Sequence, residues 1–191
     1  RRIGNEYLFQ MMAQQNVETL NGYGVKKIVT ACPHCYNTLK NEYSQFGGNY
    51  EVYHHTEFIS DLLKNGRLSL SKEVGEIVSY HDSCYLGRYN GIYNAPREIV
   101  NALPGVRSVE MERHRKGSFC CGGGGGHMWM EMNIGRRVNV IRVEELLKAE
   151  PTVAATACPF CLSMFEDGIK AKDAAEKVRV MDLAQLVAQA L

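Results

Sequence analysis

The chain lacks three features that would assign it to common classes of protein. No run of 18 consecutive apolar residues is present, so no segment of this sequence is expected to span a bilayer. Positive charge is not in excess, because 22 lysines and arginines balance 21 acidic residues, which argues against an electrostatic nucleic-acid binder. No secretory signal pattern is present. The chain also opens with Arg1 rather than methionine, and we therefore expect a fragment of a longer protein.

Cysteine, by contrast, is abundant, with seven residues among 191. An odd number of cysteines without a signal sequence argues against a secreted disulfide framework. Buried structural thiols are the simplest alternative, but two C-P-x-C pairs and an adjacent Cys-Cys pair are unlike random scatter. Three chemical interpretations follow: a redox dithiol, a zinc site or an iron–sulfur site. The seven residues are Cys32, Cys35, Cys84, Cys120, Cys121, Cys158 and Cys161.

The redox and zinc interpretations each leave part of the pattern unexplained. The tetrapeptide Cys32-Pro33-His34-Cys35 matches the active-site motif of oxidising disulfide oxidoreductases, in which a helix N-terminus lowers the pKa of the first thiol. A near copy at residues 158–161 and three further cysteines argue against a dithiol that works alone. Zinc knuckles are commonly about 15–20 residues apart. These pairs are much further apart, and adjacent cysteines are awkward ligands for one tetrahedral ion.

The iron–sulfur interpretation uses every cysteine from Cys84 onward. Between Cys84 and Cys120 lie 35 residues, and between Cys121 and Cys158 lie 36, with Cys161 completing a final C-x-x-C. Five thiolates exceed what a four-cysteine cubane needs. A larger or opened cluster would use all five.

An internal repeat explains the odd cysteine count. The tetrapeptide Thr-Ala-Cys-Pro occurs at residues 30–33 and again at 156–159, 126 residues later. Two further pairs align at this offset, Val52 with Val178 in short strands and Thr56 with Asp182 as helix N-caps. We therefore predict two copies of one unit. Residues 1–70 form the C-terminal half of the first copy, whose N-terminal part is missing, and residues 71–191 form a complete second copy.

Hydrophobic periodicity predicts alternating helices and strands. The expected helices cover residues 5–21, 33–46, 56–65, 95–103, 134–148, 159–171 and 182–190, and the expected strands residues 26–31, 50–55, 76–82, 106–112, 152–157 and 178–181. This alternation predicts an α/β fold of two pseudo-repeated Rossmann-like units with mostly parallel sheets. The cysteines follow expected strands, and the carboxyl ends of parallel strands are where open α/β sheets bind ligands.

The two prolines of the C-P-x-C pairs sharpen this expectation. Pro33 and Pro159 fall where a first helical residue is expected, because proline lacks only an amide hydrogen that would have no partner there. Each C-x-x-C then lies on a first helical turn with both sulfurs on one face. The free amides and the positive end of the helix dipole would stabilise an anionic thiolate centre.

Five consecutive glycines follow the Cys-Cys pair. A flexible linker is one interpretation, and a phosphate loop is disfavoured because no Gly-Lys-Ser/Thr follows. We favour close packing against a cluster, with amides of Gly122, Gly123 and Gly124 aimed at its sulfurs, which would raise its reduction potential. His81 is expected either to hydrogen-bond near the cluster or carry a proton, or to be structural. The stretch 128–130 is expected in the core or at a domain interface.

The spacing C-x35-C-C-x36-C-x-x-C, with Cys-Cys-Gly at residues 120–122, resembles the cysteine-rich CCG domain. That domain occurs in heterodisulfide reductase subunits and in iron–sulfur subunits of glycolate oxidase, anaerobic glycerol-3-phosphate dehydrogenase and lactate-utilisation systems, usually twice in tandem. The stretches 1–7 and 126–131 look most like membrane-associated iron–sulfur oxidoreductases of the heterodisulfide-reductase-D type. Some of these are linked to electron-transfer flavoprotein and menaquinone.

The resemblance implies a cofactor and a ligand set. In this family a complete motif holds a noncubane [4Fe-4S] cluster through five cysteines. The implied ligands of one such cluster are Cys84, Cys120, Cys121, Cys158 and Cys161. Cys32 and Cys35 would be two ligands of a second cluster, completed by residues upstream of this sequence.

The resemblance also implies a function. We expect an iron–sulfur subunit that relays electrons from a flavoprotein or thiol donor toward a quinone. Its partners would be other redox subunits or domains (ferredoxin-like, flavoprotein, haem or quinone-reactive membrane parts). It would be cytoplasmic, at the inner face of the membrane through the rest of the full-length protein. Two alternatives stay open: disulfide reduction at the cluster itself, and a zinc-stabilised module without catalytic activity.

Overall fold

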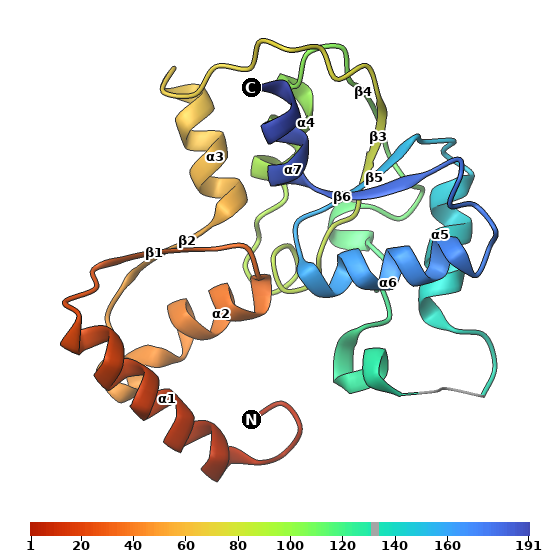
Figure 1. Cartoon of the computed structure of the whole chain (residues 1–191). Helices are drawn as coiled ribbons and strands as arrows, with labels where there is room; N and C mark the ends of the chain where they lie inside the picture. Colours follow the sequence, from red (N-terminus) through yellow and green to blue (C-terminus); the bar gives the residue numbers. More distant parts are fainter. Residues whose placement is uncertain (131–133) are drawn as a thin grey trace.

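The computed structural model describes residues 1–130 and 134–191 as alternating helices and strands (Figure 1). The end of the 126–131 stretch, residue 131, therefore lies outside the described residues. Along the first 70 residues the elements are α1 (Glu6–Gly22), β1 (Lys27–Thr30), α2 (Pro33–Asn41), a 3₁₀ helix (Tyr43–Phe46), β2 (Glu51–His54) and α3 (His55–Lys64). From residue 71 onward they are β3 (Ile77–Tyr80), α4 (Asn94–Ala102), β4 (Arg107–Val109), 3₁₀ helices Arg115–Gly117 and Gly124–Trp129, α5 (Val138–Leu147), β5 (Val153–Thr156), α6 (Pro159–Lys170), β6 (Arg179–Asp182) and α7 (Leu183–Ala190).

All the described strands pair in parallel, in two sheets. β1 and β2 form a two-stranded sheet, and the other four form a sheet of order β4-β3-β5-β6. The central strand β5 is buried along its whole length, as expected for a strand covered by helices on both faces. The predicted α/β class with parallel sheets is confirmed. The division at residue 70 stays a prediction, with one sheet on either side of it.

The strand registers correct the predicted repeat. In the first sheet Thr30 lies opposite His54, whereas in the second Thr156 lies opposite Asp182. The offset is therefore 126 residues at the first strand of each pair and 128 at the second. The difference arises between the strands, where α6 continues for 12 residues and α2 stops after nine, before a short 3₁₀ helix.

This shift makes two of the sequence alignments wrong. Val52 corresponds to Val180 rather than to Val178, which precedes β6. The N-cap of α3 is His54 rather than Thr56, and its ring nitrogen accepts from the amide of Thr56. Asp182 caps α7 in the same way, as expected.

Helices cover both faces of the larger sheet (Figure 1). α5 and α6 pack on one face around a cluster that includes Leu146, Ala154 and Phe165. On the other face α4 and α7 pack around Val78 and Leu186. No helix in the described part of the chain is long and apolar enough to cross a membrane.

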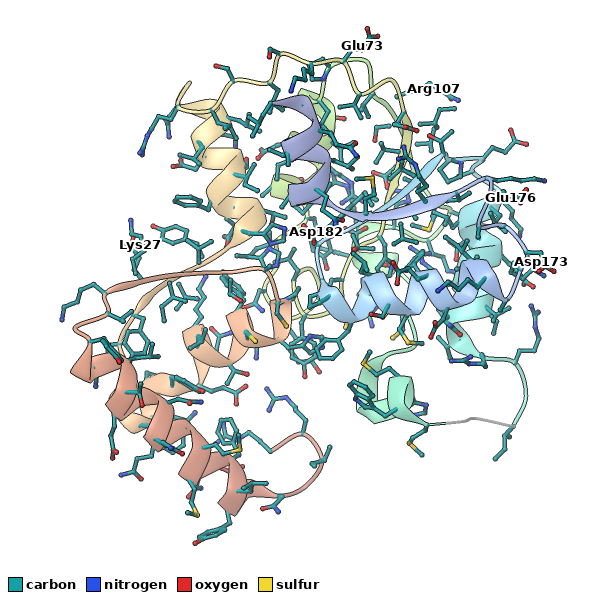
Figure 2. The ribbon with its side chains drawn as sticks, in the orientation of Figure 1. Lys27, Glu73, Arg107, Asp173, Glu176 and Asp182 are labelled. Carbon is teal, nitrogen blue, oxygen red and sulfur yellow. The ribbon has the colours of Figure 1, made fainter. Side chains whose placement is uncertain are left out.

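Helix α3 joins the two halves of the molecule. It follows β2 in the chain, but it packs against α4 and α7 of the larger sheet. Its residues Ile59 and Leu63 are half-buried against the same cluster as Leu186. At the base of α3, His55 Nε2 lies 3.0 Å from a carboxylate oxygen of Asp182, which Figure 2 shows at the junction between the sheets.

The structure corrects two expectations for the segment after the glycines, the start of the helix and the core position of residues 129 and 130. Helix α5 begins at Val138 rather than at residue 134. Trp129 and Met130 are 79% and 54% exposed and are not in the core; Met128 alone packs partly against it. The reason is local, because Gly125 and Gly126 adopt positive φ angles of 64° and 80°, which turn the chain away from the sheet.

The central packing generates a stability prediction. Leu186 is fully buried between α7 and the larger sheet, so Leu186→Ala removes apolar contacts and leaves a cavity. We expect the free energy of unfolding to fall by about 2–5 kcal/mol, measured by urea unfolding and circular dichroism. Leu8→Ala, at a half-exposed position on α1, is the matched control and should change it by less than about 0.5 kcal/mol. Equal effects of the two substitutions would contradict this packing.

Candidate metal centre

Each C-P-x-C pair opens a helix, as the prolines predicted. Cys32 and Cys158 are the N-cap residues of α2 and α6, and Pro33 and Pro159 are the first helical residues. Neither N-cap side chain accepts a hydrogen bond from the helix amides. The positive ends of both helix dipoles are therefore directed toward sulfur atoms.

The starts of α2 and α6 lie close to each other (Figure 1). The side chain of His34 lies between them, with its Nδ1 3.8 Å from Sγ of Cys32 and 4.0 Å from Sγ of Cys158, although these cysteines are 126 residues apart. The imidazole ring packs between Tyr85, at 4.2 Å between ring centres, and Phe160, at 5.0 Å. Sequence reasoning treated His34 only as part of a redox motif and missed this position. Nothing in the local sequence signals it, because the contact is made across the repeat.

The charges of Cys32, His34 and Cys158 depend on one another. A hydrogen bond from the Cys35 thiol lowers the pKa of Cys32 to about 4, against the effect of burial, and His34 adds to this. Burial alone would lower the pKa of His34, but the thiolates of Cys158 and Cys32 raise it to about 9. An imidazolium between two thiolates is therefore the favoured state at neutral pH.

A second group of ligand atoms lies deeper. The Sγ atoms of Cys121 and Cys161 and a ring nitrogen of His81 all lie within 4.8 Å of one another. All three side chains are buried. His81 leaves strand β3, Cys121 lies in the loop before α5, and Cys161 is on the first turn of α6. The site is thus assembled from three segments at the carboxyl edge of the larger sheet, where open α/β sheets bind ligands.

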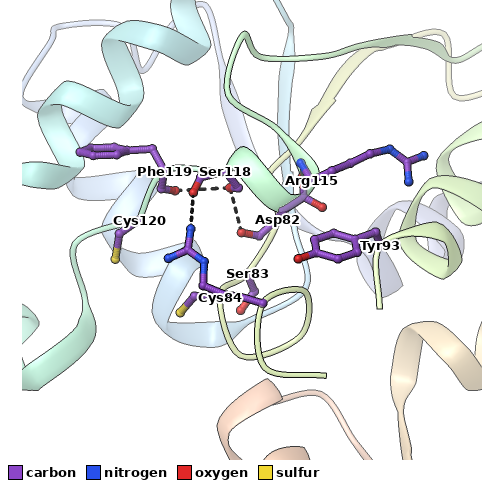
Figure 3. Close-up of a pocket in the computed structure, with 9 residues that line it drawn as sticks. Asp82, Ser83, Cys84, Tyr93, Arg115, Ser118, Phe119 and Cys120 are labelled. Atoms are coloured by element: carbon purple, nitrogen blue, oxygen red, sulfur yellow. Dashed lines mark hydrogen bonds between the residues drawn. The ribbon is translucent and has the colours of Figure 1, made fainter. Parts of the chain in front are cut away.

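Cys84 and Cys120 line one small pocket beside this group (Figure 3). Arg88 donates to the carbonyl of Ser118 over 2.7 Å, and the Ser118 hydroxyl donates to the carbonyl of Asp82 over 3.2 Å. These bonds tie the loop that carries Cys120 to the loop that carries Cys84. The structure therefore places Cys84 next to the vicinal pair.

Hydrogen bonds connect the sulfurs to one another. The thiols of Cys120 and Cys161 donate to Cys121, which lowers the pKa of Cys121 and raises theirs. The neighbouring Cys161 thiol, against burial, lowers the pKa of Cys158 to about 5. Burial, together with the negative charge of Cys121, raises the pKa of Cys84. The five thiols thus share few negative charges, and ionising all of them requires a cationic centre among them.

The donor set tests which group fits. None of the seven cysteines, all of which lie among the described residues, forms a disulfide. Five sulfurs with soft donor character, three of them buried and two half-buried, suit iron–sulfur ligation, whereas one tetrahedral zinc ion would use only four. The residues present therefore fit an iron–sulfur cluster.

The glycines differ from one another at this site. Gly122 has φ of 89°, its amide donates to Sγ of Cys120 over 3.3 Å, and a Cβ there would lie 3.0 Å from the amide nitrogen of Asn139. A Cβ on Gly123 would lie 3.1 Å from Cγ of Met164 and 3.7 Å from Sγ of Cys121. Gly124 has open space around it, and nothing there requires glycine.

Comparison with known proteins agrees with this geometry. The chain matches the cysteine-rich CCG domain over residues 1–40 and 78–166. It is 52% identical, over its whole length and 27% of the relative, to the "Probable iron-sulfur-binding oxidoreductase FadF" of Bacillus subtilis. It is 48% identical, over its whole length and 28% of the relative, to the "EtfAB:quinone oxidoreductase" of Syntrophomonas wolfei.

A more distant relative is a subunit of the dihydromethanophenazine:CoB–CoM heterodisulfide reductase of Methanosarcina barkeri. It is 35% identical over 94% of this chain and 44% of the relative. The chain thus spans less than half the length of these curated relatives.

The glycine geometry generates a prediction with an internal control. In Gly122→Ala the new side chain is strained at positive φ and contacts the backbone of Asn139. We expect the free energy of unfolding to fall by about 1–3 kcal/mol, and Cys121 to react faster with a thiol reagent, as followed by mass spectrometry. Gly124→Ala should leave both measurements unchanged. A Gly122→Ala variant that matches Gly124→Ala in both would contradict the tight packing beside Cys121.

Proposed function

We propose a function for this chain from one established premise: it belongs to the cysteine-rich CCG domain family. It is an iron–sulfur electron-transfer component of an oxidoreductase. The observation that supports the proposal is the clustering of five cysteines from three distant segments of the chain at the carboxyl edge of the larger sheet. The names of its relatives, an iron–sulfur-binding oxidoreductase and a heterodisulfide reductase subunit, support the same class of chemistry.

The proposed cofactor is a [4Fe-4S] cluster of the noncubane type, which accepts and releases single electrons. Its ligands are Cys84, Cys120, Cys121, Cys158 and Cys161. Among them, Cys158 and Cys161 bind at the positive end of α6, which favours an anionic centre. The amide of Gly122 donates to a ligand sulfur and favours the reduced state.

A second cluster site includes Cys32 and Cys35. These residues repeat the arrangement of the first site at the start of α2, and Cys32 is separated from Cys158 only by the ring of His34. Other parts of the protein would supply the remaining ligands. Two centres on either side of one imidazolium form a short path for electrons through the middle of the molecule.

We propose a flavoprotein or thiol donor and a quinone as acceptor. The name of the Syntrophomonas wolfei relative, an EtfAB:quinone oxidoreductase, supports both ends of this route. Other redox subunits or domains, including a membrane part that reacts with quinone, would complete the assembly at the cytoplasmic face of the membrane.

Disulfide reduction at the cluster is the second candidate, supported by the relative from Methanosarcina barkeri. The pocket beside Cys84 and Cys120 distinguishes the two functions. Its cavity volume is about 10 Å³, whereas sites that hold small organic molecules enclose roughly 300–1,000 Å³. The small pocket favours electron relay over binding of a disulfide substrate.

Metal analysis tests the proposal. The protein, purified without oxygen, should contain iron and acid-labile sulfide in equal amounts and no stoichiometric zinc. Cys121→Ser should lose most of the iron bound at the second-repeat site, because Cys121 is buried and bonds to two other ligands. Cys35→Ser, at an exposed position, is the matched control and should keep that iron. Zinc without sulfide would instead favour the zinc-stabilised module.

A further inference from the structure

Arg142 is the bulkiest fully buried side chain among the described residues, with 0% of its surface exposed. It lies on the buried face of α5. Burial of a guanidinium is costly, and here it lowers the pKa of Arg142. A buried charge of this kind is retained only where something compensates for it.

The partners of Arg142 compensate its charge in part. Its Nη1 donates to the carbonyl of Arg113 and lies 3.0 Å from a carboxylate oxygen of Glu145. That carboxylate also accepts from the backbone amide and the guanidinium of Arg113, so its charge is shared. Asp82, the other nearby acid, is paired with Arg97 through two bonds of 2.7 and 2.8 Å. Nη2 of Arg142 is buried and has no hydrogen-bond acceptor within the described part of the chain.

The remaining bond of Arg142 runs toward the site. Its Nε donates to Nδ1 of His81 over 3.4 Å. Arginine has no lone pair to offer, so Nδ1 of His81 must be the acceptor, and a neutral ring then carries its proton on Nε2. Phe165 packs against the ring at 4.8 Å between centres, and the backbone amide of His81 donates to the carbonyl of Ala155. The ring is therefore fixed in both tautomer and position.

This arrangement determines what His81 can do beside Cys121 and Cys161. A metal ligand needs a free lone pair on nitrogen, but one ring nitrogen accepts from Arg142 and the other carries a proton. His81 is thus unsuited to be a ligand, although its distance from the two sulfurs would permit it. Its Nε2–H is instead available as a donor to sulfur.

We propose that Arg142 is a positioning residue that sets the reduction potential of the cluster through His81. It fixes the Nε2–H tautomer, which donates to a sulfur ligand, and its own buried charge faces the anionic centre. Both effects favour the reduced state, because reduction adds negative charge. The inference rests on the proposed function, since it requires a redox centre at the five cysteines.

The test compares midpoint potentials of the reconstituted protein by redox titration followed by electron paramagnetic resonance. In Arg142→Gln the charge is lost but a polar side chain is kept; Arg142→Met removes both charge and donor. At the wild-type midpoint potential we expect the ratio of reduced to oxidised cluster to fall at least tenfold in Arg142→Met, which is 59 mV for one electron. Arg113→Gln, which shares the Glu145 partner without contacting His81, is the matched control and should shift the ratio less than twofold.

A double variant tests whether Arg142 acts through His81. If Arg142 acts mainly through His81, the double variant His81→Gln/Arg142→Met should have nearly the potential of His81→Gln alone. Strictly additive shifts, or an unchanged potential in both Arg142 variants, would overturn the inference. Pulsed resonance on protein with ¹⁵N-labelled histidine should show only a weak nitrogen coupling that His81→Gln removes, and a strong coupling of a directly bound nitrogen would also overturn it.

The same samples separate the two proposals. Wild-type protein that binds no iron or sulfide would contradict the proposed function and the inference with it. Wild-type protein with a full cluster whose potential does not depend on Arg142 would contradict only the inference. Iron content per chain, measured for every variant, ensures that potentials are compared between loaded proteins.

Discussion

The parallel pairing of β3 with β5 is the constraint on which the site depends. It sets Tyr80 beside Ala155, although 75 residues separate them, and so brings the chain segments that follow both strands to one edge of the sheet. His81 and Cys84 come directly after the first strand, and Cys158 and Cys161 after the second. A parallel ladder has all its carboxyl ends on one side, so a shift of register would move one set of sulfurs away from the other. The hydrogen bonds of a few apolar residues therefore determine the geometry of the thiols.

The sequence predicted those parts of the molecule that local chemistry controls. Proline at a first helical position and apolar periodicity placed the helix starts and the strands, and thereby the cysteines. The N-cap of α3 was misplaced because the segment between β1 and β2, residues 31–50, is two residues shorter than the segment between β5 and β6, residues 157–178. A change of length between repeats is invisible when only a repeated tetrapeptide fixes the alignment. The exposed position of Trp129 was missed for a different reason. The positive φ angles of two glycines direct the chain here, so the apolar character of the side chain does not determine its burial.

The residues that sequence reasoning missed act across long distances in the chain. His34 contacts a cysteine of the other repeat, and Arg142 contacts His81 across 61 positions. On an amphipathic helix an arginine is ordinarily expected on the solvent face, and only the tertiary fold shows that this one is buried. Both cases involve charged side chains, half-buried in His34 and fully buried in Arg142, whose compensating neighbours come from several segments. Patterns within one segment contain no information about such partners.

Helix α3 has a consequence for how the two halves can move. It continues directly from β2, yet its apolar side packs against α4 and α7, so the first half contributes to the core of the second. A hinge motion between the sheets would have to expose that shared core to water. This packing therefore opposes changes in the width of the gap that His34 spans. In the electron relay proposed above, where the rate of tunnelling would fall steeply with distance, such a gap would make that rate insensitive to thermal fluctuations of the surrounding loops.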